Sequence, residues 1–311
     1  MTMLKFVTKD THIDFLKARY LTYALSGIMI AFAIWSMCFK SFNFGIDFSG
    51  GVLIEIKSEQ KIDVEKVRSE LSVLNLDEIN LQALGTEGKE LMIRAQAENA
   101  DEVAQRKAVV DIKNILGSKY EYRRVETVGP QVGEELKMAG IIASVLALLA
   151  IALYIWIRFE WQFAIGALIG LAHDIVVVVG LLSYFRFDIS LTTVAAVLTL
   201  VGYSINDTVV TYDRIRENLK KYRKMPQYEL INKSINDIFS RTILTGITTL
   251  IAVLPLYIWG GEALESFSFT IFVGLIIGTY SSIYVSSVFL NLFDLRAVNH
   301  KDEDNYFATI G

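Results

Sequence analysis

Six long apolar segments constrain this 311-residue chain more than any other feature of its sequence. A helix needs about 20 apolar residues to cross the roughly 30 Å hydrocarbon core of a bilayer. Backbone groups in lipid must bond within their own segment, so such runs favour spanning helices. The predicted spans are 20–39, 138–157, 161–184, 191–210, 242–259 and 267–290. The sequence therefore predicts a polytopic α-helical membrane protein with six transmembrane helices.

The distribution of charge agrees with this fold class and excludes other functions. Charged residues make up 21% of the chain against 53% hydrophobic residues, so they are expected in blocks between the spans. A net charge of −4 is unlike the clustered basic surface of a nucleic-acid binder, and no nucleic-acid partner is expected. One cysteine forms no internal disulfide, and three histidines, at positions 12, 173 and 300, are too scattered for a metal site.

Basic residues set the expected orientation, because lysine and arginine in short loops resist translocation. The N-terminus (1–19) holds four basic residues and the loop 211–241 holds eight, so both are predicted to be cytoplasmic. The short connections near Arg186 and at 260–266 are then outside, and the tail 291–311 returns to the cytoplasm. The first span competes with a secretory signal, but its length and lack of a small-residue cleavage pattern favour an uncleaved anchor.

The polar segment 40–137 is predicted to be an extracytoplasmic domain. Its pattern gives a strand at 52–57, a helix at 63–74, strands at 78–84 and 90–95, a helix at 98–116 and a strand at 120–128. This β-α-β-β-α-β order is the ferredoxin-like arrangement. No catalytic constellation stands out, so a binding or mechanical role is favoured over an enzyme. Before the first strand, Gly45, Gly50 and Gly51 predict a tight turn, with Asp47 as a capping carboxylate.

Ionisable residues inside the spans are candidate functional groups, because each costs at least about 2.5–3.5 kcal/mol near the bilayer centre. The third span carries His173 and Asp174, the fourth carries Asn206 and Asp207, and Arg241 opens the fifth. The alternative is that Asp207 with Arg241, and His173 with Asp174, are static pairs that hold helices together.

The loop 211–241 becomes amphipathic after Pro226, where one helical face carries apolar side chains. These side chains are Ile231, Ile235, Ile238 and Phe239. The pattern predicts a helix on the membrane surface, and docking onto a partner is the alternative use of the same face.

The fourth span carries a specific signature. The run Val201–Val210, followed by Asp213–Asn218, resembles the SecF family of protein translocase subunits, within the SecD/SecF family and the RND superfamily. Three further features are similar to motifs of that family in the same order, and the resemblance covers about residues 15–290. They are the Gly45–Phe48 turn with Gly50 and Gly51, the His173–Asp174 pair, and Arg241–Thr242 with Thr248–Thr249.

This resemblance implies one half of a twelve-span unit in the bacterial inner membrane, with a SecD-like subunit as the other half. It implies work with the SecYEG channel on an unfolded preprotein at the outer side, with YajC and YidC as candidate partners. Protons are the implied coupling ion, passing by way of Asp207 and Arg241, with no other cofactor. The competing functions are half of an RND-type exporter of lipid or small molecules and an intramembrane enzyme; protease motifs for the latter are absent from the sequence.

Overall fold

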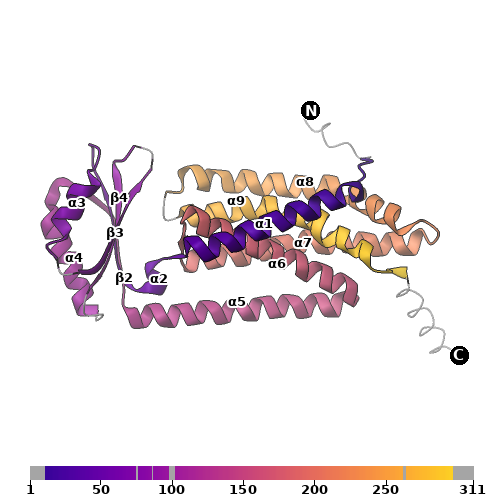
Figure 1. The fold of residues 1–311 in the computed structure, drawn as a ribbon, viewed down its shortest axis with the longest axis horizontal. Helices are drawn as coiled ribbons and strands as arrows, with labels where there is room; N and C mark the ends of the chain where they lie inside the picture. Colours follow the sequence, from indigo (N-terminus) through magenta and orange to yellow (C-terminus); the bar gives the residue numbers. More distant parts are fainter. Residues whose placement is uncertain (1–10, 75, 86, 98–101, 262–263, 297–311) are drawn as a thin grey trace. The chain divides into compact units, whose positions relative to one another are not determined.

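The computed structural model describes residues 11–74, 76–85, 87–97, 102–261 and 264–296. They fall into two compact units (Figure 1). The helical unit comprises the chain up to Phe42, Ser144–Phe187 and the chain from Thr192 onward. The sheet unit comprises Asn43–Ala143 and Asp188–Leu191.

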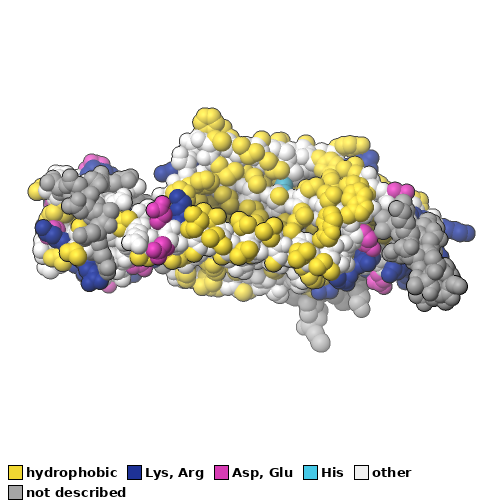
Figure 2. Space-filling model, turned by 90° about the horizontal axis from the view of Figure 1, so that it is seen from below, with side chains coloured by type: hydrophobic (Ala, Val, Ile, Leu, Met, Phe, Trp, Pro, Cys, Tyr) yellow, Lys and Arg dark blue, Asp and Glu magenta, His cyan; other side chains and the backbone are white. Residues whose placement is uncertain are grey.

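Six helices in the described part of the chain are long and apolar enough to cross a membrane. They are α1 (Arg19–Lys40), α5 (Pro130–Arg158), α6 (Trp161–Phe185), α7 (Leu191–Lys221), α8 (Gln227–Trp259), and α9 (Glu265–Ser281) together with the helical segments that continue it to Leu292. Helices α6 and α9 are largely buried, whereas α5 and α8 are largely exposed. Figure 2 shows hydrophobic side chains covering the visible face of the helical unit, as a lipid-facing surface requires. The predicted fold class is confirmed.

Small residues let the buried helices approach closely. A Cβ added at Gly180 of α6 would lie 2.3 Å from the Cβ of Ala33 in α1. One added at Gly274 of α9 would lie 2.6 Å from the Leu200 side chain of α7. The hydroxyl of Ser183 donates to the carbonyl oxygens of Ser36 and Ser41 at 3.2 and 3.1 Å. Close backbone contact and interhelical hydrogen bonds stabilise helix pairs in lipid, where the hydrophobic effect between helices is weak.

The sheet unit has the predicted ferredoxin-like topology. Its elements are β2 (Gly51–Lys57), α3 (Val64–Leu71), β3 (Leu76–Leu84), β4 (Glu90–Ala97), α4 (Glu102–Leu116) and β5 (Glu121–Val128). The strands pair in the order β3-β4-β2-β5, and every pair is antiparallel. Alternate residues of β2, among them Ile54, pack with Leu71 of α3 and Ile112 of α4. Leu53 faces the other way and packs with Ile46.

The glycine-containing turn forms a short helix, α2 (Ile46–Ser49), followed by two glycines with positive φ. A Cβ at Gly50 would lie 2.9 Å from the Cα of Pro130, and one at Gly51 would lie 2.8 Å from the Ala95 carbonyl oxygen. The prediction of a tight turn with close backbone approach is confirmed. The predicted capping role of Asp47 serves a different helix, because its carboxylate accepts a hydrogen bond from the Leu191 amide at 3.0 Å, at the start of α7.

A two-residue parallel pair, missed from the sequence, lies beside this turn. Strand β1 (Asn43–Phe44) pairs with β6 (Asp188–Ile189). Arg94 of β4 donates to Asn43 at 3.2 Å and contacts Asp188. These bonds tie two chain segments that flank membrane helices to the open face of the sheet.

Four helices have bounds that differ from those of the predicted apolar spans. Helix α5 begins at Pro130 rather than 138, because Pro fits the first helical position and good helix formers follow it. The predicted loop 211–241 shrinks to 222–226, since α7 continues to Lys221 and α8 begins at Gln227. Helix α9 ends at Ser281 and continues as a π-helical segment, Ser282–Ser287, which apolar periodicity does not distinguish from an α-helix.

The amphipathic face after Pro226 is covered by this chain rather than lying on a membrane surface. Ile231 and Ile235 of α8 are buried in one hydrophobic cluster with Ile215 and Leu219 of α7. Phe15, from the segment before α1, belongs to the same cluster. The charged stretches of α7 and α8 are therefore helical because they carry an apolar stripe at helical spacing that packs within the protein.

Candidate functional site

Asp174 lies at the centre of a polar cluster among three helices. Its carboxylate accepts hydrogen bonds from the hydroxyls of Ser204 on α7 and Ser281 on α9, at 2.5 and 2.7 Å. Its other oxygen lies 3.0 Å from Nδ1 of His173. The Asp174 side chain is fully buried. Three partners satisfy this side chain, as a buried polar group requires.

A glycine makes this cluster possible. A Cβ at Gly278 of α9 would lie 3.2 Å from the Cβ of Ser204 and 3.7 Å from the Asp174 carboxylate. A larger residue would press against both groups. Gly278 therefore acts as a packing position that brings α9 to the polar cluster.

Asp207, one turn beyond Ser204 on α7, is also buried, with 5% of its surface exposed. Its Oδ2 has no hydrogen-bond partner among the described residues. The backbone carbonyl of Asp207 accepts from the Thr211 hydroxyl at 2.9 Å. Asp207 therefore differs from Asp174, because its carboxylate is enclosed without being satisfied.

Arg241, near the middle of α8, is exposed on the surface of this chain. Within the described residues, no nitrogen of Arg241 lies within 4.0 Å of a carboxylate oxygen, including those of Asp207. The two residues do not form a contact pair in this arrangement. Asn206 is exposed on α7 and lies outside the buried cluster. The structure thus brings together His173 and Asp174, encloses Asp207, and leaves Asn206 and Arg241 at the surface.

Other buried polar atoms in the described part of the helical unit also lack a hydrogen-bond partner, as Oδ2 of Asp207 does. Nε2 of His173, the hydroxyl of Tyr203 and the hydroxyl of Ser286 have no hydrogen-bond partner there. Buried polar atoms are usually satisfied, so unsatisfied atoms on neighbouring helices require an explanation.

Sequence reasoning missed Ser281 and the π-helical segment that follows it. The Tyr212 hydroxyl donates to the Ser286 carbonyl at 3.1 Å, and the Ser287 hydroxyl donates to Ser282 at 2.6 Å. The available signal was the pair of Ser-Ser dipeptides at 281–282 and 286–287 within an apolar span. Hydroxyls in such a span usually bond to a neighbouring helix or to their own backbone.

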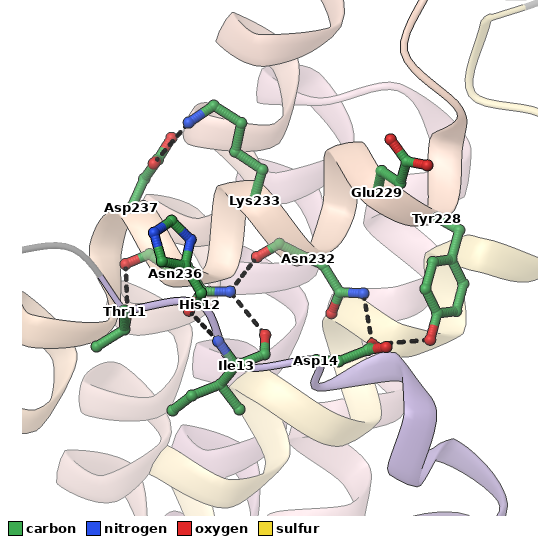
Figure 3. Close-up of a pocket in the computed structure, with 10 residues that line it drawn as sticks. All are labelled: Thr11, His12, Ile13, Asp14, Tyr228, Glu229, Asn232, Lys233, Asn236 and Asp237. Carbon is green, nitrogen blue, oxygen red and sulfur yellow. Dashed lines mark hydrogen bonds and ion pairs between the residues drawn. The ribbon is translucent and has the colours of Figure 1, made fainter.

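A second polar feature is a cavity of about 410 Å³ between the segment 11–14 and the start of α8 (Figure 3). Asn236 donates to the Ile13 carbonyl at 2.8 Å and accepts from its amide at 2.9 Å. Asn232 and the Tyr228 hydroxyl both donate to Asp14 at 2.7 Å. We call residues 11–16 the N-terminal arm, which these side chains hold along α8.

The ionisable groups of this cavity include both acids and bases, which does not define one class of ligand. They are His12, Asp14, Glu229, Lys233 and Asp237. Among the described residues, no group of three or more His, Cys, Asp or Glu side chains is placed to hold a metal ion.

The sequence of this chain is similar to that of a family of protein export membrane proteins. Residues 108–296 match the family "Protein export membrane protein SecD/SecF, C-terminal", and residues 35–62 match the SecD/SecF GG motif. The chain is 47% identical over 304 residues to the protein translocase subunit SecF of Rickettsia rickettsii, covering 96% of this chain and 97% of the relative. It is 45% identical over 302 residues to the SecF subunit of Rickettsia felis, with the same coverage.

Solved structures of SecDF are also similar. The chain matches SecDF, a translocon-associated membrane protein from Thermus thermophilus, with a TM-score of 0.83 and 35% identity over 92% of this chain. A super-membrane-facing form of SecDF matches with a TM-score of 0.65. The chain spans only 39% of the first SecDF chain and 40% of the second, so each holds a large part that has no counterpart here.

Proposed function

We propose that this chain, which belongs to the SecD/SecF family of protein export membrane proteins, is a SecF-type subunit. Its proposed role is to couple inward proton flow to preprotein translocation. It would work in the bacterial inner membrane with a SecD-like subunit and act on protein emerging from the SecYEG channel. YajC and YidC are further candidate partners. Both termini and the α7–α8 turn would be cytoplasmic, and the sheet unit would lie outside.

The exposed face of α8 supports a partner half. Arg241 and Thr248 are exposed on a helix whose other exposed residues include Ile247 and Ile251. A guanidinium facing hydrocarbon costs at least about 2.5–3.5 kcal/mol, and charged side chains in spans almost always face a bundle interior or a wet cavity. A second bundle covering α8 would remove Arg241 from lipid. The relatives named SecDF, whose chains are more than twice as long, hold room for such a half.

The observation that carries the proton role is the buried Asp207 carboxylate with an unpartnered oxygen. An enclosed acid without an ion pair can gain and lose a proton without breaking a structural bond. Arg241 on the next helix is the nearby cation that would favour the charged form when it approaches. Asp174 and His173, with Asn206 at the surface, are proposed as further groups along the route.

The energy available suits a mechanical role. A proton crossing 100 mV gains about 2.3 kcal/mol, which biases a two-state equilibrium by a factor of about 50. That is enough to favour one position of a domain over another in each cycle. A sheet unit without an evident catalytic group fits binding or pulling rather than chemistry on a substrate.

The deciding experiment is Asp207→Asn in the assembled complex, tested in inverted vesicles with and without a proton gradient. Asparagine keeps the shape and removes the titratable carboxyl group. We expect normal membrane abundance and partner binding, normal ATP-driven export, and loss of the gradient-dependent gain.

The matched control is Asp213→Asn, the same change on the same helix, because Asp213 is an exposed carboxylate paired with Arg158 at 2.9 Å. Exposed pairs contribute little, so the control should export like the parent. Loss of abundance in Asp207→Asn would favour a static structural role, and normal gradient-dependent export would remove Asp207 from the route.

The second candidate function is half of an exporter of lipid or small molecules. Capture of a SecD-like protein and of the SecYEG channel by the tagged chain separates the two. An exporter half would bind another exporter half and leave protein export unchanged when it is depleted.

A further inference from the structure

The neighbouring helices α7 and α8 each carry one acidic and one basic side chain that can pair across the helix interface. On α7, Asp207 is followed seven residues later by Arg214 and eleven residues later by Asn218, which places all three on one helical face. On α8, Asp237 precedes Arg241 by four residues, which also places them on one face. On each helix the acid precedes the base. Because a short turn joins the two helices and α8 runs back along α7, the acid of each helix lies toward the base of the other.

Only one of the two possible pairs across these helices is formed. Arg214 contacts Oδ2 of Asp237 through Nη2 at 2.7 Å and through Nε at 2.9 Å. The Asn218 amide donates to the same oxygen at 3.1 Å. Lys233 takes the other oxygen, Oδ1, at 3.2 Å, a contact visible in Figure 3. Both carboxylate oxygens of Asp237 are thus occupied by groups other than Arg241.

Without Arg214, Asp237 would have a suitable partner on its own helix. An acid four residues N-terminal to an arginine is in the favourable orientation for an ion pair along a helix. Oδ2 would keep only the neutral Asn218 amide, and the guanidinium of Arg241 lies one turn away. An ion pair between Asp237 and Arg241 within α8 would hold the guanidinium of Arg241 toward the N-terminal end of that helix. The guanidinium would then be less available to Asp207.

We propose that Arg214 is a positioning residue that holds Asp237 away from Arg241, so that Arg241 remains available to Asp207. The inference rests on the proposed proton role of Asp207 and Arg241. Arg214 itself exchanges no proton in this scheme. Its effect is exerted through the carboxylate that it occupies.

The test is a suppressor experiment in the assembled complex. Arg214→Gln should keep membrane abundance and partner binding and lose most of the gradient-dependent export. Adding Asp237→Asn to Arg214→Gln should restore it, because the competing carboxylate is gone. Asp237→Asn alone should retain the gain. If Arg214 and Asp237 serve only as a structural bridge, the double variant will be no better than Arg214→Gln, and the proposal is wrong.

The control is Arg158→Gln, which removes an exposed arginine whose partner is Asp213 on α7. It removes one positive charge near α7 without releasing a carboxylate beside Arg241. Export should be unchanged. Equal loss in Arg158→Gln and Arg214→Gln would show that general charge, not the competition for Arg241, is responsible.

A structure of the Arg214→Gln complex tests the competition without reference to protons. We expect a nitrogen of Arg241 within hydrogen-bonding distance of Asp237, a contact that the parent lacks. If that contact forms while Asp207→Asn exports normally, the competition stands and the proton role fails. If the contact does not form, the positioning role of Arg214 is overturned whatever Asp207 does.

Discussion

Two buried aspartates of the helical unit have different environments, and this difference sets their expected roles. Asp174 has three partners on its carboxylate, including hydroxyls from α7 and α9. Asp207 keeps one oxygen without a partner among the described residues. A satisfied carboxylate suits the joining of helices, since breaking its bonds would leave several buried groups unpaired. An unsatisfied one suits exchange with a mobile proton.

Two glycines give a matched prediction at this scale. Gly180→Ala places a methyl group 2.3 Å from the Ala33 Cβ and 2.5 Å from its Cα, so α1 and α6 must separate. Overpacking of this kind costs about 1–3 kcal/mol. Gly202→Ala meets no atom within 4 Å and should be neutral or stabilising by up to about 1 kcal/mol.

The measurement is thermal unfolding of the purified protein in one detergent. A lower melting temperature is expected for the Gly180 variant alone. Equal melting temperatures for the two variants would contradict the close approach of α1 and α6.

At the scale of elements, the hydrophobic pattern predicts an element well where it alone decides the structure. The four strands and two helices of the sheet unit follow from alternation and helical spacing, as with Ile54 facing the helices and Leu53 facing away. The extension of α7 to Lys221 could not be seen from an apolar window, because charged residues cover the exposed side of that stretch. The β1–β6 pair is too short to give a period.

The candidate site was predictable in its residue types and not in its geometry. His173, Asp174 and Asp207 stand out because ionisable groups in apolar runs are rare. The two hydroxyl partners of Asp174, Ser204 and Ser281, are assigned only by the packing of α7 and α9 around Gly278. The absence of a contact pair between Asp207 and Arg241 depends on helix separation, which no spacing along the sequence determines.

The N-terminal arm should loosen in acid. The hydrogen bond from the Tyr228 hydroxyl, ahead of that from Asn232, holds the pKa of Asp14 below its usual 3.8. A depressed carboxylate pKa adds stability above the unfolded value, and that stability is lost as the pH falls below 3.8 through the folded pKa.

A spin label at position 12 measures this change. It should become more mobile as the pH falls below 3.8, and an Asp14→Asn background should abolish most of the pH dependence. A label whose mobility rises equally in both backgrounds would show that Asp14 does not hold the arm.

At the scale of the whole molecule, the exposed apolar surfaces of α5 and α8 show a chain suited to lipid and to a second bundle. Residues such as Leu149 on α5 and Ile251 on α8 are exposed to about the same degree. Sequence alone predicts that both helices span the membrane. The sequence does not show which of the two helices faces lipid and which faces a partner. Arg241 is the exception, because a charged residue within a span indicates that α8 faces a partner.

Orientation is the prediction that belongs to this scale. Single cysteines replacing Glu87 and Lys221, both exposed, are introduced in a Cys38→Ala background. A membrane-impermeant maleimide added to intact spheroplasts should label position 87 and leave position 221 unlabelled until the cells are opened. Labelling of position 221 in sealed cells would invert the proposed topology.

The hydrogen bond between Asp47 and the Leu191 amide joins positions that are 144 residues apart. At a synthesis rate of about 5–20 residues per second, roughly 7–29 seconds separate their emergence from the ribosome. The last strand of the sheet unit, ending at Val128, is complete well before the first turn of α7 exists. The Asp47 carboxylate of α2 is therefore synthesised long before the Leu191 amide with which it bonds. The cap of α7 can therefore form only after all four strands of the sheet unit have been synthesised.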